Sequence, residues 1–75
     1  MRYDGKKLME ARLAKGWDQT ETAYRAGVSV STISRVESGD RQRPPTIKKI
    51  AKVLGVRLRD IMVSDTEAEP AGARR

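Results

Sequence analysis

The sequence predicts a small all-α domain of five helices over residues 1–63, followed by a disordered tail over residues 64–75. Three observations lead to this fold class. Glycines that can end helices divide the chain into helix-length segments, and they are Gly16, Gly27, Gly39 and Gly55. Residues that favour N-cap positions stand before several of these segments. One segment also carries apolar residues at the spacing i, i+3, i+4, i+7, which is typical of a helix face.

The first helix is expected over residues 4–15, with Asp4 as its N-cap and with Tyr3 and Leu8 as a hydrophobic staple. Its inner face is predicted from the apolar positions, which are Leu8, Ala11, Met9 and Leu13. The second helix is expected over residues 18–26. It begins with an aspartate version of the capping box, Asp18, Gln19, Thr20 and Glu21. Its only apolar inner positions are two alanines, so we expect shallow burial: Ala23 and Ala26.

The third segment has two interpretations. Val28 and Val30 alternate with hydroxyl residues, which favours a strand. However, Val28, Ser29 and Ile33 fit the N′, N-cap and N4 positions of a short helix, and Val36 follows Ile33 on the same face. We interpret this segment as a helix over residues 30–38, because a lone strand would have no partner with which to pair.

The fourth and fifth helices follow a polar loop over residues 40–45, in which Pro44 and Pro45 set the entry to the fourth helix. Its apolar stripe has the clearest helical spacing in the chain: Ile47, Ile50, Ala51 and Leu54. A short fifth helix is expected from three further apolar residues, Leu58, Ile61 and Met62. From residue 64 onward the chain is acidic, rich in small residues and interrupted by proline and glycine, which predicts disorder.

The composition excludes several classes of protein. The 75 residues contain no Cys and no His, so disulfides, thiolate or imidazole metal sites and imidazole catalysis are excluded. No apolar stretch approaches the ~20 residues of a membrane span, and no signal peptide follows Met1. We therefore expect a cytoplasmic protein that is not an enzyme, with no catalytic residues, metal, cofactor or membrane partner.

The charge favours a polyanionic partner. The chain has 16 Lys and Arg against 10 Asp and Glu, a net charge of +6, and residues 1–63 alone carry +7. Nucleic acid is the first candidate and an anionic membrane surface the second. The membrane is the poorer candidate, because the basic residues are spread over several segments rather than along one amphipathic face.

Two short helices meeting across residues 26–29 predict a helix-turn-helix unit. Gly27 supplies the backbone freedom that a tight turn needs, and the small Ala23 lets the two helices approach closely. In such a unit the second helix projects its N-terminal half toward phosphates and base edges. The pattern alone is shared by helical hairpins of many functions.

Residues 16–23 and 27–39 resemble the XRE-type, lambda-repressor-like DNA-binding domain, most specifically in the run from Gly27-Val28-Ser29 to Ser38-Gly39. Arg43-Pro44 and Leu54-Gly55-Val56 stand at the expected distances downstream. The resemblance covers roughly residues 5–63. It implies a compact five-helix regulator of bacterial or phage type, most often a repressor, that binds double-stranded DNA with residues 30–38 in the major groove. It also implies a homodimer on a palindromic operator, and therefore association with the nucleoid.

The resemblance assigns DNA contacts to ten residues: Gln19, Ser29, Val30, Ser31, Thr32, Ser34, Arg35, Ser38, Arg41 and Arg43. Gln19 matches a phosphate contact, and residues 38–43 match a loop that clamps the backbone. The base-facing positions are Val30, Ser31, Ser34 and Arg35. An orienting ion pair is implied between Arg12 and Glu37. Each residue also has a plainer interpretation, as a packing, capping or solvated side chain.

Three residues depart from the family pattern. Thr22 stands where a buried leucine is usual, so the second helix should pack less firmly. Asp40 replaces a common basic residue, which weakens a phosphate contact or moves it to Arg41. Arg57 replaces a serine-type cap before the fifth helix. Two other functions remain open: an antitoxin that binds a toxin and represses its own promoter, and an adaptor that uses this fold to bind protein without DNA.

Overall fold

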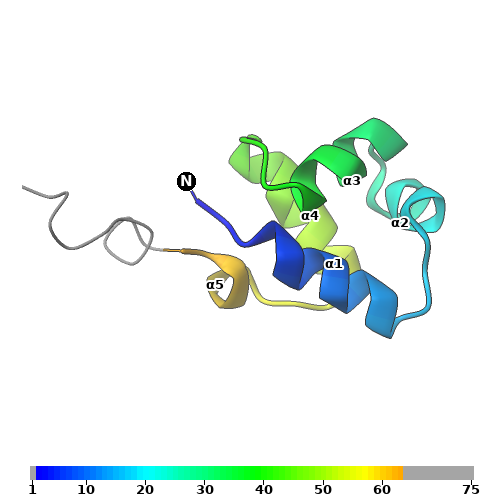
Figure 1. Ribbon diagram of the computed structural model, residues 1–75, viewed down its shortest axis with the longest axis horizontal. Helices are drawn as coiled ribbons and strands as arrows, with labels where there is room; N and C mark the ends of the chain where they lie inside the picture. Colours follow the sequence, from blue (N-terminus) through cyan, green and yellow to red (C-terminus); the bar gives the residue numbers. More distant parts are fainter. Residues whose placement is uncertain (1, 64–75) are drawn as a thin grey trace, which may run out of the picture.

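The computed structural model describes residues 2–63, which form five helices (Figure 1). Their bounds are α1 Gly5–Ala14, α2 Gln19–Ala26, α3 Val30–Glu37, α4 Pro44–Leu54 and α5 Leu58–Ile61. The all-α, five-helix fold class is confirmed for this part of the chain. The tail expected over residues 64–75 lies outside the described residues.

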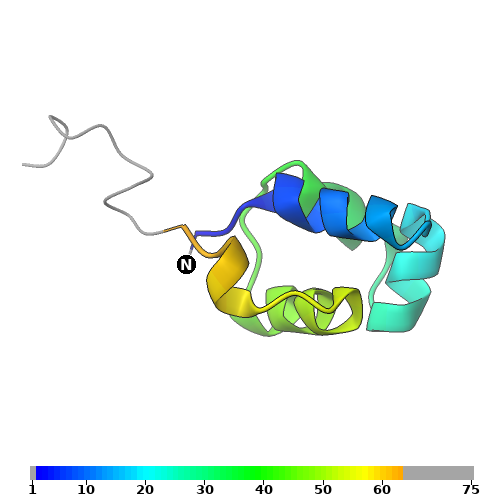
Figure 2. The ribbon, with the colours of Figure 1, turned by 90° about the horizontal axis from the view of Figure 1, so that it is seen from below.

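The helices enclose one apolar core. α1 and α3 lie on one side and α4 on the other, while α2 crosses one end of the molecule and α5 closes the opposite end (Figure 2). α2 packs against both α3 and α4, and α1 packs against α3, α4 and α5. Each helix contributes at least one buried apolar side chain to the core: Leu8, Ala23, Ala26, Ile33, Val36, Ile47, Ile50, Ala51, Leu54 and Ile61.

Side-chain caps begin the first three helices where the sequence predicted them. The Asp4 carboxylate accepts hydrogen bonds from the N–H groups of Lys6 and Lys7, at 3.0 and 3.2 Å. Asp18 accepts from the N–H of Glu21 at 2.7 Å. Each cap satisfies N–H groups that have no partner within the helix.

The start of α2 departs from the predicted capping box. The Glu21 carboxylate does not close a reciprocal box but pairs with Arg25, four residues later, at 2.6 Å. The Arg25 guanidinium lies 4.3 Å from the centre of the half-buried Trp17 ring, which precedes the helix. An ion pair and a cation–π contact therefore hold this end of α2.

One expectation about burial was wrong and another was incomplete. Leu13 is 57% exposed, because it lies five positions after Leu8 and therefore points away from the inner face of the helix. Arg12, four residues after Leu8, takes the inward position and is buried. α2 also buries more than its two alanines. Thr22 is 1% exposed, and its hydroxyl donates to the Asp18 carbonyl at 2.9 Å, which removes the cost of burying a polar group.

The last two helices begin without a side-chain cap bond. α4 begins at Pro44, so both prolines lie inside its first turn, where a missing N–H costs nothing. α5 begins after Arg57, which makes no side-chain cap bond but pairs with Asp60 at 3.2 Å. Ile61 is 1% exposed and joins the core, whereas Met62 is 38% exposed.

Two tight approaches join distant parts of the chain, and neither was predicted. A Cβ atom on Gly5 would lie 2.1 Å from the Val36 carbonyl oxygen, so the start of α1 presses against the end of α3. The segment before α1 pairs with the segment after α5 in an isolated antiparallel bridge between Tyr3 and Met62. Backbone N–H groups flank this bridge, with Asp4 donating to the Ile61 carbonyl at 2.7 Å.

Candidate nucleic-acid interface

The turn between α2 and α3 sets the direction of α3. Gly27 ends α2 in the left-handed conformation, with a φ of 73°, and the Val28 N–H donates to the Ala23 carbonyl at 3.0 Å. Val28 is half-buried and packs against the core that contains Ile33, as the predicted staple requires. The Ser29 hydroxyl accepts from the Thr32 N–H at 3.1 Å and caps α3.

α3 has one buried and one exposed face. Ile33 and Val36 are each 1% exposed and anchor the helix in the core. The opposite face carries the side chains for which the resemblance implies base contacts, all of them exposed: Val30, Ser31, Ser34 and Arg35. Val30 is 41% exposed although it is apolar. The face thus presents one methyl-bearing, two hydroxyl and one guanidinium side chain to solvent.

Three other hydroxyl residues of this region take part in capping or helix hydrogen bonds. The Ser29 and Thr32 hydroxyls contact each other at 2.9 Å, beside the cap at the start of α3. The Ser38 hydroxyl donates to the Ser34 carbonyl at 3.0 Å. A hydroxyl oxygen retains acceptor capacity after donating, so these bonds do not prevent a contact with a donor. A contact with phosphate would compete with them.

A buried polar network joins the first three helices. Arg12 holds Glu37 through two bonds, Nε to Oε2 at 2.6 Å and Nη2 to Oε1 at 3.1 Å, and both side chains are at most 10% exposed. Arg12 also donates from Nη1 to the Trp17 carbonyl at 2.8 Å. Gln19, the first residue of α2, donates from Nε2 to Glu37 Oε1 at 3.0 Å. The network therefore fixes the end of α3 relative to α1 and to the start of α2.

The position of Gln19 restricts how it could bind phosphate. One N–H of its amide is directed to Glu37, but an amide nitrogen carries two N–H groups. The second N–H is the group that could reach a phosphate. Because Glu37 holds the amide in place, any such contact would come from a side chain already fixed in position.

The loop from Ser38 to Arg43 continues the exposed face of α3. Gly39 takes a φ of 88°, and the Asp40 N–H donates to the Arg35 carbonyl at 2.9 Å, which reverses the chain at the helix end. Arg41 and Arg43 are exposed. The first turn of α4 offers no anion site of its own, because Pro44 and Pro45 have no N–H. The N–H groups that follow them both donate to the Arg43 carbonyl.

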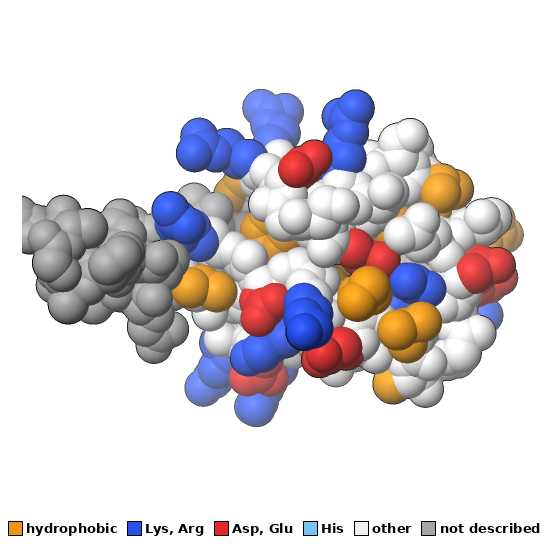
Figure 3. Space-filling view, in the orientation of Figure 1, with side chains coloured by type: hydrophobic (Ala, Val, Ile, Leu, Met, Phe, Trp, Pro, Cys, Tyr) orange, Lys and Arg blue, Asp and Glu red, His pale blue; other side chains and the backbone are white. Residues whose placement is uncertain are grey.

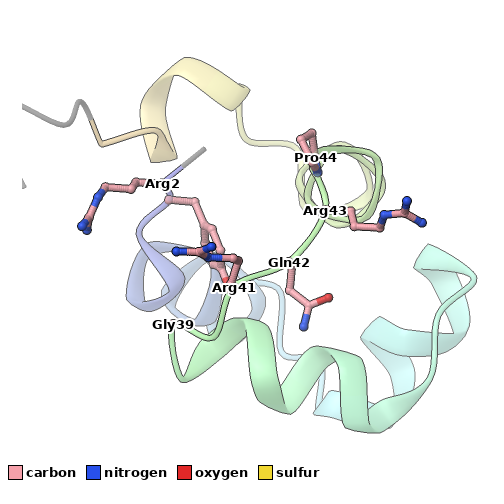
Figure 4. Close-up of a pocket in the computed structure, with 7 residues that line it drawn as sticks. Arg2, Gly39, Arg41, Gln42, Arg43 and Pro44 are labelled. Atoms are coloured by element: carbon pink, nitrogen blue, oxygen red, sulfur yellow. The ribbon is translucent and has the colours of Figure 1, made fainter.

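A shallow groove lies between this loop and the N-terminal segment (Figure 4). Its described lining consists of Arg2, Tyr3, Gly39, Arg41, Gln42, Arg43 and Pro44. The sequence identified Tyr3 only as a staple and did not single out Arg2 or Gln42. The one available signal was the basic residue directly before Tyr3. Its place beside the loop follows from the Tyr3–Met62 bridge, which local sequence does not encode.

Charge is distributed unevenly over the surface in view in Figure 3. Lys and Arg side chains project from the edge formed by α3 and the loop into α4, with little acidic surface among them. At the opposite edge, near α1 and α5, basic and acidic side chains are mixed. Basic side chains in this view therefore gather beside α3, with an acidic side chain among them, and such a gathering suits a polyanion.

Residues 2–63 contain neither a membrane-spanning helix nor a cluster of metal ligands. No helix there is long and apolar enough to cross a membrane. The same residues contain no group of three or more Asp and Glu side chains placed to hold a metal ion.

Comparison with known proteins gives a consistent result. A family model described as helix-turn-helix matches residues 8–61. An uncharacterized HTH-type transcriptional regulator of Bacillus subtilis, RghRB, is 39% identical over 62 residues, which are 80% of this chain. The chain spans 45% of the length of that relative.

Solved structures of similar fold include three regulators or complexes. The restriction-modification controller protein C.AhdI from Aeromonas hydrophila is 35% identical, with a TM-score of 0.68 over 75% of this chain and 86% of that one. The N-terminal DNA-binding domain of SinR from Bacillus subtilis is 28% identical, with a TM-score of 0.69 over 88% and 99%. A chain of the HipA-HipB-O2-O3 complex is 28% identical, with a TM-score of 0.66 over 83% and 84%.

Proposed function

We propose, because the chain belongs to the helix-turn-helix family, that it represses transcription by binding a palindromic DNA operator as a homodimer. The fold is that of DNA-binding transcriptional regulators. The observation that carries the proposal is the exposed face of α3, which lies opposite the buried Ile33 and Val36. This face has the size and polarity of a helix that enters the major groove.

In this proposal the exposed face of α3 reads bases. Arg35 binds guanine through O6 and N7, which is the commonest specific contact in the major groove. Val30 packs against a thymine methyl group, and Ser31 and Ser34 bond base edges or phosphates. Arg35 lies one turn beyond Ser31 on the same face, so both can reach one short stretch of DNA.

The remaining assigned residues bind the phosphates of the DNA backbone. Arg41 and Arg43 supply the charge that the prolines at the start of α4 cannot supply through N–H groups. Gln19 donates its second amide N–H to a phosphate beside the start of α2. Hydroxyls at Ser29, Thr32 and Ser38 contribute weaker contacts at the two ends of α3. These contacts set the position of the protein and carry no sequence information themselves.

The homodimer is proposed to form through α5 and the residues beside it. One recognition helix reads only a few base pairs, so specific binding requires two half-sites about 34 Å apart. Met62 is 38% exposed and Leu58 is half-buried, which leaves apolar surface next to Ile61. A footprint of two half-sites with two chains per duplex at saturation supports the dimer. A footprint that covers a single half-site, with one chain per duplex at saturation, contradicts it.

The test of the proposed function is selection of binding sites from random double-stranded DNA. The expected result is an enriched palindromic sequence that binds at least 100-fold more tightly than its scrambled form at physiological salt. Equal affinity for the selected and the scrambled duplex contradicts sequence-specific regulation. Absence of binding to either duplex would favour the adaptor, which uses the fold without DNA.

An antitoxin is the second candidate function, and one observation favours it. One of the similar chains was solved in a complex named for both HipA and HipB, so this fold occurs in an assembly with a second protein. Co-purification from the native host, followed by mass spectrometry, separates the candidates. A stoichiometric toxin partner that leaves operator binding intact establishes the antitoxin. Recovery of the chain with DNA alone establishes the simple repressor.

A further inference from the structure

Tyr3 stands in a segment that is tied to the rest of the fold. Its backbone pairs with Met62 in the antiparallel bridge. The next N–H, that of Asp4, donates to the Ile61 carbonyl at 2.7 Å, and the half-buried Tyr3 ring packs against the core. The first residues of a domain are usually poorly ordered unless they are tied down in this way. The Tyr3 side chain therefore starts from a backbone that is fixed relative to the core.

The Tyr3 hydroxyl reaches the loop between α3 and α4. It donates to the Asp40 carbonyl, which is 37 residues away in the sequence. Burial raises the pKa of Tyr3, and the Asp40 carboxylate raises it further, so the hydroxyl keeps its proton at neutral pH and can donate it. The Asp40 N–H in turn donates to the Arg35 carbonyl at 2.9 Å. Asp40 is therefore held both from the end of α3 and from the N-terminal segment.

The Asp40 carbonyl belongs to the peptide bond that leads into Arg41. A peptide bond is planar, so the direction of this carbonyl fixes the plane from which the Arg41 backbone continues. Arg41 is exposed, and it lines the same groove as Tyr3. The bond from the Tyr3 hydroxyl consequently determines the direction in which the chain enters Arg41.

Arg43, the other arginine of this loop, is supported in a different way. Its carbonyl accepts from the N–H groups of Thr46 and Ile47, at 3.0 and 3.2 Å, so its backbone is joined to the first turn of α4. The side chains of Arg41 and Arg43 project from different sides of the loop (Figure 4). The two arginines therefore depend on different supports, and the support of Arg41 is the one that includes Tyr3.

We propose that Tyr3 is a positioning residue of the DNA interface, whose hydroxyl holds the peptide bond between Asp40 and Arg41 so that Arg41 reaches a phosphate. This inference rests on the proposed function, since it requires that Arg41 contact the DNA backbone. A tyrosine that served only to close the fold would need its ring and its bridge to Met62 but not its hydroxyl. The hydroxyl is therefore the group to remove.

The first test compares Tyr3→Phe with a matched control, Tyr24→Phe. Both variants lose one phenolic hydroxyl and keep the ring, but Tyr24 is 83% exposed and lies near the C-terminal end of α2. Affinity for a duplex selected by the wild-type protein is measured by fluorescence anisotropy over a range of salt concentrations. Tyr3→Phe should bind about 3- to 10-fold more weakly, as expected for one lost hydrogen bond, and with a smaller log–log salt slope. Tyr24→Phe should match wild type in both.

The second test identifies the arginine through which Tyr3 acts. Tyr3→Phe is combined in turn with Arg41→Ala and with Arg43→Ala, and each double variant is titrated beside its single variants. With Arg41→Ala the two losses should not add, because the contact that Tyr3 supports is already gone, and the double variant should bind within about twofold of Arg41→Ala. With Arg43→Ala the losses should add. Losses that add with Arg41→Ala, or wild-type affinity in Arg41→Ala itself, overturn the inference.

Failure of this inference can be distinguished from failure of the proposed function. If wild-type protein does not distinguish the selected duplex from its scrambled form, the proposed function fails and the inference falls with it. If wild-type protein does distinguish them and Tyr3→Phe binds like wild type, the inference alone is wrong. Thermal unfolding shows whether each variant is folded at the temperature of the titration. A Tyr3→Phe variant that is unfolded there also contradicts the inference, because the hydroxyl would then be needed for the fold itself.

Discussion

Helix α4 buries three large aliphatic side chains and an alanine, whereas α2 buries one threonine and two alanines. Full burial of a Val, Leu, Ile or Phe side chain contributes about 1.5–3 kcal/mol, so α4 is held mainly by the hydrophobic effect. α2 and α3 are joined to α1 by Arg12, Glu37 and Gln19, and a buried ion pair of this kind adds little net stability because its charges lose their hydration. The comparison teaches that α4 secures the fold, while the polar network sets where α3 points.

The largest expected change in stability comes from a substitution in α4, which is held mainly by apolar contacts. Ile47 is completely buried, so Ile47→Ala removes its contacts and leaves a cavity among the core side chains. The expected loss is about 2–5 kcal/mol in the free energy of unfolding, measured by urea denaturation. The exposed Lys48→Ala is the control and should change it by less than about 0.5 kcal/mol. A similar stability for both variants would contradict the role given to α4.

The next effect tests the contact between the start of α1 and the end of α3. In Gly5→Ala the new Cβ atom would meet the Val36 carbonyl oxygen at 2.1 Å, and a backbone atom cannot rotate away. We expect a loss of about 1–3 kcal/mol in unfolding free energy, together with weaker DNA binding because the end of α3 must shift. Gly16→Ala offers a contrast, because its Cβ would meet no atom within 4 Å and its cost comes from the φ of 75° alone. If the Gly5→Ala variant is fully folded and its DNA affinity is unchanged, the contact between α1 and α3 does not influence how α3 binds DNA, which contradicts the prediction.

The third effect distinguishes base contacts, which give sequence specificity, from phosphate contacts, which give affinity without specificity. Arg35→Ala should cost about 1–3 kcal/mol on the selected duplex, and much less on a scrambled one, because a base contact is lost. Arg43→Ala should weaken both duplexes alike and lower the salt slope by about one, because a phosphate contact is lost. Titrations of both variants on both duplexes at several salt concentrations measure this. Equal weakening by Arg35→Ala would move base reading to Val30, Ser31 or Ser34.

The smallest effect concerns Asp40, which opposes the basic loop. Asp40→Asn removes a negative charge beside the groove but keeps the backbone carbonyl that accepts from Tyr3. We expect a two- to fivefold gain in affinity at low salt that diminishes as salt rises, since exposed charges are screened. Asp60→Asn on α5 is the matched control and should change affinity less. A loss of affinity in Asp40→Asn would show that the carboxylate has a positive role in binding.

Much of the fold was predictable because its signals are local. The N-caps at Asp4, Asp18 and Ser29 depend on the chemistry of one side chain and the next few residues. The stripe of α4 has the helical period and no competing pattern. The prediction that Leu13 lies on the inner face of α1 was wrong. Hydrophobicity alone does not separate an inner from an outer position when a buried arginine lies next to it.

The parts that were missed depend on contacts between distant residues. The bridge between Tyr3 and Met62 and the approach of Gly5 to Val36 follow from packing of the whole chain. The bond from Gln19 to Glu37 likewise joins two helices, so the sequence alone could assign Gln19 only by resemblance. The groove beside Arg2 was missed for the same reason, although each of its arginines is visible in the sequence.

The central claim is that the Arg12–Glu37–Gln19 network orients α3 more than it stabilises the protein. It is tested most directly by the double variant Arg12→Met with Glu37→Met, which replaces the buried ion pair with apolar side chains. Such replacements are often neutral or stabilising. We expect an unfolding free energy within about 1 kcal/mol of wild type, together with at least tenfold weaker binding to the selected duplex. Wild-type affinity in a stably folded double variant would contradict the claim.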